Sequence, residues 1–134
     1  MYSLDTNTVA YFFKGMGGVG TRLLAVPPAE ITVSAVVAFE LAVGVAKSLE
    51  ATRRREQLSR FLAAITVVPF RREEAEVAAG VRADLEQRGL PIGPLDVLIA
   101  GTALAHGAVL VTRNTRVFAR VPGLRVESWY DEGK

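Results

Sequence analysis

The sequence predicts an α/β fold in three layers, with a mainly parallel central sheet between helices. Short runs of β-branched and apolar residues alternate with longer helical patterns along the 134 residues. Strands that alternate with helices are joined by right-handed crossovers, which cover both faces of a parallel sheet. The composition, 50% hydrophobic and 22% charged, suits one buried core, and no linker or repeat divides the chain. We therefore expect residues 1–134 to form a single domain.

Each predicted element rests on a local pattern. Strands are predicted where β-branched and apolar residues cluster in short runs, and helices where apolar residues recur at helical spacing. The strands fall at residues 1–4, 30–33, 66–70, 108–111 and 125–128. The helices run up to about residue 13, then over 35–46, 51–64, 72 to a stop at Gly89, and 95–106 before Gly107.

The segment KGMGGVGTR imitates a dinucleotide-binding fingerprint. Gly15, Gly17 and Gly20 satisfy G-x-G-x-x-G, and Glu40 follows twenty residues later. The context differs, because the glycines follow a predicted helix and not a strand. The apolar stretch after them also stops at Pro27, too early for the crossover helix that binds a pyrophosphate. We predict a flexible loop here and no dinucleotide site.

The residue types that are missing exclude several chemistries. The chain has no cysteine and a single histidine, His106, which excludes a disulfide framework, a thiolate zinc site, a cysteine nucleophile and a histidine cluster. It shows neither a signal-type amino terminus nor an apolar run long enough to cross a bilayer. We expect a cytoplasmic protein that does not contact the membrane.

The charge balance permits nucleic-acid binding without requiring it. Sixteen basic and fourteen acidic residues give a net charge of +2. The densest positive patch lies in TRRREQLSR, and its members are Arg53, Arg54, Arg55 and Arg60. A solvated helix face is the favoured interpretation of this patch, and a surface that RNA approaches is the alternative.

Polar residues follow several predicted strands, where parallel α/β sheets place their binding sites. These residues are Asp5 with Thr6 and Asn7, then Ser34, and finally Thr112 and Asn114. Asp96 begins a later helix after two prolines. Taken alone, Asp5 is better explained as the N-cap of the first helix, because Asp caps helices well.

Considered together, three carboxylates favour a metal site over the capping interpretation. Glu40 lies in the segment SAVVAFELAVGVAKS, which offers no clean polar face, and Asp96 lies in a helix that is otherwise almost entirely apolar. No Lys or Arg stands at helical spacing to pair with either of them. Together with Asp5 they predict a Mg²⁺ or Mn²⁺ site, because these cations prefer oxygen ligands. Such a metal can activate water against a phosphodiester.

Four blocks now identify a family. They are LDTN at the first strand, FELAVGVAKS around Glu40, LPIGPLDVLIAGTALAHG around Asp96, and LVTRNTRVFARVPGLRVESW near the end. In this order and at this spacing, the chain resembles the VapC-type toxins nearly end to end. These are PIN-domain ribonucleases of bacterial type II toxin–antitoxin pairs.

The resemblance implies a PIN-like three-layer α/β/α fold and a set of roles. Asp5, Glu40 and Asp96 match the metal-binding carboxylates of the family, and the implied metal is Mg²⁺ or Mn²⁺. Thr112 and Asn114 match the polar pair after the fourth strand, and Asn114 joins the three carboxylates as a candidate catalytic residue. Supporting positions around them are Thr6, Asn7 and Ser34.

The chain departs from the family at that polar pair. Many relatives carry an acid where Asn114 stands, and others carry one where this chain has Val117. One negative charge fewer should weaken a second metal. We therefore expect one firm metal site and leave a second one open.

The implied function is a metal-dependent endoribonuclease that inhibits translation and growth. The resemblance also implies a homodimer, a cognate VapB-like antitoxin whose tail lies in an apolar groove, and an RNA substrate, with transfer and ribosomal RNA both known in the family. Two alternatives stay open: a catalytically weak nucleic-acid-binding or regulatory module, favoured by Asn114, and a phosphohydrolase of small phosphate esters.

Overall fold

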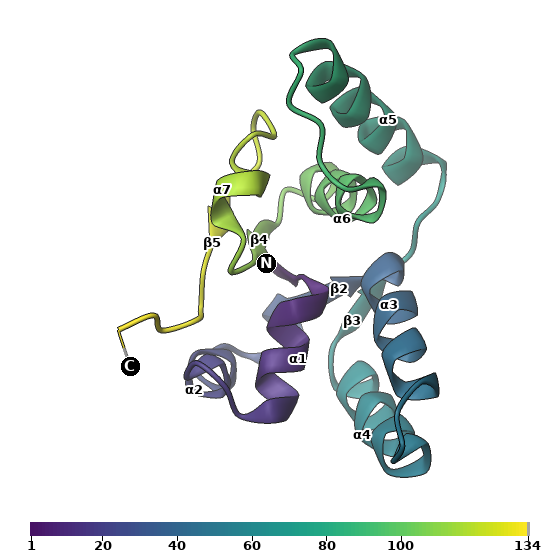
Figure 1. Cartoon of the computed structure of the whole chain (residues 1–134), viewed down its shortest axis with the longest axis vertical. Coiled ribbons are helices and arrows are strands. Elements are labelled where there is room, and N and C mark those ends of the chain that lie inside the picture. Colours follow the sequence, from purple (N-terminus) through teal and green to yellow (C-terminus); the bar gives the residue numbers. More distant parts are fainter. Residues whose placement is uncertain (134) are drawn as a thin grey trace.

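A parallel sheet forms the centre of the molecule in the computed structural model, which describes residues 1–133 (Figure 1). Its strand order is β3-β2-β1-β4-β5, and every neighbouring pair is parallel. The strands are β1 (Tyr2–Leu4), β2 (Ile31–Ser34), β3 (Thr66–Val68), β4 (Val109–Val111) and β5 (Val126–Glu127). The predicted parallel sheet is confirmed, with strands somewhat shorter than predicted or, at β2, shifted by one residue.

Helices cover both faces of this sheet. The chain moves outward from β1 to β2 and β3, then returns to β4 and β5 on the other side of β1, so right-handed crossovers place the two sets of helices on opposite faces. Figure 1 shows one set below the strands and the other above them. The first set is α1 (Thr6–Lys14), α2 (Val19–Leu24), α3 (Ala35–Ala46) and α4 (Ala51–Ala64). The second is α5 (Arg72–Gln87), α6 (Pro94–Ala105) and α7 (Thr115–Phe118).

The glycine-rich segment corrects one prediction. Gly15, Gly17 and Gly18 adopt positive φ in the turn after α1, as loop glycines do. Gly20, however, lies inside the short helix α2, so the predicted loop ends earlier than expected. This helix forms because Val19 and Leu23, one turn apart, are both buried. The glycines do follow a helix and not a strand, as predicted.

The core holds the three central strands, β2, β1 and β4, in a fixed register. Leu4, Val33 and Leu110 are fully buried in one continuous apolar cluster. On one side of the sheet, α5 and α6 approach each other closely, because a Cβ on Gly101 would lie 2.6 Å from the Cα of Ala78. This close packing fixes the position of α6, the helix that carries Asp96.

A partly buried polar pair joins α5 to the end of α6. Glu74 accepts a hydrogen bond of 2.8 Å from the backbone amide of Arg71 and contacts Nε2 of His106 at 2.6 Å. Both interactions favour the carboxylate, so the pKa of Glu74 is lowered, the amide of Arg71 having the larger effect. The only histidine of the sequence therefore serves the fold. Within residues 1–133, no helix is long and apolar enough to span a bilayer.

Candidate active site

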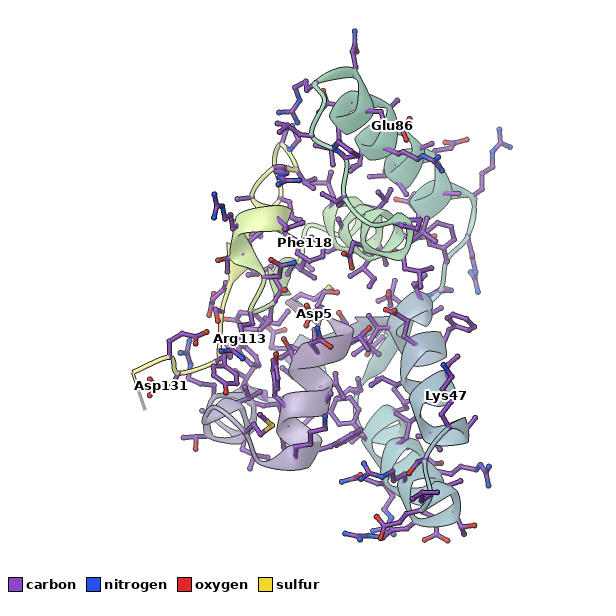
Figure 2. All side chains as sticks on the ribbon, in the orientation of Figure 1. Asp5, Lys47, Glu86, Arg113, Phe118 and Asp131 are labelled. Carbon is purple, nitrogen blue, oxygen red and sulfur yellow. The ribbon has the colours of Figure 1, made fainter. Side chains whose placement is uncertain are left out.

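Asp5 lies at the carboxyl end of β1, near the centre of the molecule (Figure 2). It is the N-cap of α1, and its Oδ1 accepts a hydrogen bond of 2.9 Å from the amide of Thr8. The capping interpretation is thus confirmed. Burial raises the pKa of Asp5, and repulsion from Glu40 adds to this, although hydrogen bonds from Thr112 and Thr8 oppose it. A buried acid whose charged form is disfavoured is more than a helix cap requires.

Glu40 reaches the same edge of the sheet from α3. Its Oε1 accepts a hydrogen bond of 2.6 Å from Oγ1 of Thr6, the first residue of α1. This bond fixes the half-buried side chain of Glu40 close to Asp5, the neighbour of Thr6 in the sequence. The start of α3 is set by Ser34, whose fully buried Oγ accepts a hydrogen bond of 3.1 Å from the amide of Val37. The structure therefore gives Thr6 a direct contact to a candidate ligand and gives Ser34 a capping role.

Asp96 stands in the first turn of α6, where the positive end of the helix dipole favours a carboxylate. A Cβ on Gly93, the N-cap, would lie only 3.2 Å from its Oδ2, so glycine leaves room for this half-buried side chain. The pKa of Asp96 is nevertheless raised, first by burial and then by repulsion from Glu40 and Asp5. All three carboxylates therefore influence one another electrostatically.

The three carboxylates fit a hard cation in their chemistry. None of the ion pairs found among residues 1–133 includes Asp5, Glu40 or Asp96, so their charges have no cationic partner there. Their oxygens are ligands that Mg²⁺ and Mn²⁺ prefer. The side chains are not drawn together into a finished ligand set: across the described part of the chain, no three His, Cys, Asp or Glu residues are close enough to hold one ion.

A cavity of about 340 Å³ opens beside Asp5. Its lining residues are Asp5, Asn7, Tyr11, Arg113 and Asn114. Thr112 is fully buried beneath it, and its Oγ1 accepts a hydrogen bond of 3.0 Å from the amide of Asn114. The structure thus brings together Asp5, Asn7 and the polar pair after β4.

The arginine cluster on α4 is mostly removed from this site. Arg53 and Arg60, with exposures of 82% and 81%, pair with Glu50, the N-cap of α4, and with Glu56 within the helix, as a solvated face would. Arg55 is also exposed. Arg54 alone of the four lines a second cavity, which it shares with Glu40. A role of these arginines in RNA binding remains a prediction.

That second cavity is a groove of about 280 Å³ between α1, α3 and α4. Its walls are largely apolar and include Phe13, Leu41 and Leu58. Thr6 and Glu40 also line it, so the groove reaches the candidate site.

Arg113 is the residue that sequence reasoning missed. It stands between Thr112 and Asn114 in the sequence and lines the cavity beside Asp5. A single cation between two polar residues that follow a strand was the available signal. Its partners, however, lie at distant positions of the chain and could not be identified from the residues around Arg113 in the sequence.

Comparisons with known proteins agree with this geometry. Residues 2–124 match the model of the PIN domain family. A tRNA(fMet)-specific endonuclease VapC of Salmonella typhimurium is 33% identical over 128 residues, which span 96% of this chain and 97% of that protein. Ribonuclease VapC2 of Rickettsia felis is 36% identical over 131 residues, or 96% and 98% of the two chains.

Solved structures give the same result. The chain superposes with a TM-score of 0.88 on a chain of VapBC2 from Rickettsia felis bound to a promoter DNA fragment, at 34% identity and with 96% and 98% of the two chains covered. For DNA-bound VapBC from Salmonella typhimurium the TM-score is 0.89, at 33% identity, with 96% and 97% covered. Because family, relatives and fold agree over nearly the whole length, the chain belongs to the PIN domain family and, within it, to the VapC-type toxin ribonucleases.

Proposed function

We propose that this VapC-type ribonuclease is an endonuclease that depends on Mg²⁺ or Mn²⁺, and that Asp5, Glu40 and Asp96 hold the metal. The observation that carries the proposal is that these three carboxylates lie within electrostatic reach of one another at the carboxyl edge of a parallel sheet, without a cationic partner among residues 1–133. Transfer RNA is the first substrate to test, because relatives from Salmonella typhimurium and Shigella flexneri are named tRNA(fMet)-specific endonucleases. Action on cellular RNA would take place in the cytoplasm.

The other residues of the site have separate roles in the proposed reaction. When bound, a divalent cation lowers the pKa of water and neutralises charge on a phosphate. Thr6 holds Glu40 in place through its hydroxyl. Asn7 and Asn114, which line the cavity beside Asp5, are placed to orient the RNA backbone through their amides. Ser34 acts through the backbone, because it fixes the start of the helix that carries Glu40.

Cleavage of an RNA pool by the purified protein tests the proposal. We expect fragments with Mg²⁺ or Mn²⁺ and none with EDTA, and Asp5→Asn serves as the silent control. Binding without metal-dependent cleavage would instead support the catalytically weak module that Asn114 favours. Hydrolysis of small phosphate esters but not of RNA would support a different phosphohydrolase.

We also propose two protein partners. The structural neighbours include VapBC toxin–antitoxin complexes, and the apolar groove that reaches Glu40 suits the tail of a small VapB-like antitoxin. An Arg on such a tail would match the clustered carboxylates with its planar fork. Phe39 and Val43, one turn apart on α3, are both exposed and would suit a homodimer contact. Size-exclusion chromatography with light scattering, with and without the antitoxin, tests both.

A further inference from the structure

Arg113 follows β4 and is held by an ion pair beside the candidate site (Figure 2). Its Nε and Nη2 donate to the two carboxylate oxygens of Glu132, at 2.7 and 2.8 Å. The guanidinium carbon also lies 3.7 Å from the ring centre of Tyr130, and Nη1 is 3.4 Å from the hydroxyl of Tyr11. The guanidinium is thus held by an aromatic ring, and two of its three nitrogens, Nε and Nη2, donate to one carboxylate.

This arginine shares the cavity of Asp5. Asp5, Asn7, Tyr11 and Asn114 line the same space, and Arg113 is the one cation among its described lining residues. The C-terminal segment that carries Glu132 lies against the turn after α1, where the amide of Asp131 donates to the carbonyl of Gly17 at 2.8 Å. Glu132 therefore reaches Arg113 from a different part of the chain.

The negative charge of the site favours a cation close to where a phosphodiester substrate would bind. Three carboxylates repel a phosphodiester, and a single metal would offset only part of that charge. An Arg fork matches a carboxylate and a phosphate with the same two parallel hydrogen bonds, so Glu132 occupies the place that phosphate oxygens could take. The exchange costs little, because Arg113 and Glu132 are 39% and 60% exposed and exposed ion pairs are weak.

We propose that Arg113 is a substrate-binding residue that holds an RNA phosphate next to the scissile one, and that Glu132 takes the place of that phosphate when RNA is absent. The proposal rests on the proposed function, since it requires an RNA substrate. Tyr130 keeps the guanidinium plane in position while the partner changes.

The test measures the binding of a short single-stranded RNA in EDTA, where no metal-dependent cleavage occurs. We expect Arg113→Gln to weaken binding about ten-fold and to reduce the slope of log K against log salt by about 0.7, the value for one phosphate contact on a single strand. Glu132→Gln breaks the same ion pair but frees the guanidinium, so we expect it to tighten binding several-fold. Arg82→Gln, which removes the arginine of α5 that pairs with Glu86, is the matched control and should leave binding unchanged, because Figure 2 shows Glu86 far from Arg113 and Asp5.

The two variants separate binding from simple anchoring of the C-terminal segment. If Arg113→Gln and Glu132→Gln both weaken binding to the same extent, the pair only anchors this segment and the proposal is overturned. An effect of Arg113→Gln no larger than that of Arg82→Gln overturns it as well. Arg113→Lys keeps the charge but loses the planar fork, and we expect it to recover only part of the affinity.

Cleavage assays with Mg²⁺ keep this proposal distinct from the proposed function. We expect Arg113→Gln to raise KM several-fold with little change in kcat, as loss of a uniform binding contact does. If the wild type cleaves RNA and the variant matches it in KM and in binding, Arg113 has no substrate role although the function stands. If the wild type binds RNA through Arg113 but cleaves with neither metal, the proposed function fails and the phosphate contact remains.

Discussion

The acids of α5 and those at the edge of the sheet differ in their surroundings. On the outer surface of α5, three acids each lie four residues from an arginine with which they pair: Glu76 with Arg72 at 2.9 Å, Glu86 with Arg82 at 2.9 Å, and Asp84 with Arg88 at 2.6 Å. At the edge, Asp5, Glu40 and Asp96 pair with no cation among residues 1–133.

The difference shows that the acids at the edge of the sheet, unlike those of α5, lower the stability of the fold. Exposed i,i+4 pairs each add only a few tenths of a kcal/mol to a helix. Buried or half-buried acids that repel one another lower stability, as the raised pKa values of Asp5 and Asp96 indicate. A cost of this kind is typical of residues that serve a ligand or a reaction.

The largest effect is expected for Asp5→Asn. Loss of a metal ligand should reduce cleavage by about 10²-fold or more, since even outer residues of metal sites cost 10- to 100-fold. Because the pKa of Asp5 is raised in the folded protein, its charge destabilises the fold at pH values above that pKa. Asn keeps the helix cap and removes the charge, so Tm of the metal-free protein should rise.

The metal response provides the control for this variant. Stabilisation by added Mg²⁺ or Mn²⁺ should shrink with the lost affinity, whereas Glu86→Gln on α5 should leave it intact. An Asp5→Asn protein that is less stable, yet keeps its activity and its metal response, would show that Asp5 is only a cap.

A smaller gain is expected for Asn114→Asp, which adds a fourth acid beside the cavity. If the missing charge limits metal binding, the concentration of Mg²⁺ that gives half-maximal cleavage should fall about ten-fold, because ligand charge strongly tunes the affinity of such sites. A metal titration of the cleavage rate measures this. An unchanged midpoint would mean that Asn114 contributes in some other way.

Glu74 offers an intermediate case, since it is buried like Asp5 but has partners like the acids on the outer surface of the same helix, α5. Its pKa is lowered, so it stabilises the fold at neutral pH, and this contribution is lost as the pH falls through the lowered pKa. Glu74→Gln should therefore lower Tm at neutral pH, and the Tm curves of variant and wild type should converge in acid. Parallel curves from pH 7 to pH 3 would contradict the role given to this pair.

The smallest effect belongs to the outer surface. Glu86→Gln removes one exposed pair with Arg82 and should lower the free energy of unfolding by about 0.3–0.5 kcal/mol at low salt, and by less at high salt. Urea unfolding at two ionic strengths measures it. A loss as large as that of a core substitution would erase the contrast between the two regions.

Much of this contrast could be predicted from the sequence. The alternation of strand and helix patterns predicted the sheet, because parallel strands buried on both faces leave short apolar runs. Glu40 and Asp96 stood out because their helices are otherwise apolar. The pKa of Asp96, which is raised by burial and then by repulsion from Glu40 and Asp5, agrees with that expectation. Asp5 was visible as a cap, and the structure confirms the cap.

Other features depend on contacts that no local pattern contains. The short helix α2 and the one-turn helix α7 form because Leu23 and Phe118 are buried in the shared apolar core. The role of Arg113 depends on Tyr11 and Glu132, which lie 102 and 19 residues away. Such partners become neighbours only after the whole sheet has formed.

The position of β1 in the sheet also determines how late in synthesis the surroundings of Asp5 can form. This strand precedes its neighbour β4 in the sequence by more than a hundred residues. The carbonyl of Val111 accepts hydrogen bonds from the amide of Asp5 and from the hydroxyl of Thr8, so the surroundings of Asp5 are incomplete until β4 is synthesised. A growing chain can therefore already contain all three carboxylates and still lack the β4 carbonyl that completes the surroundings of Asp5.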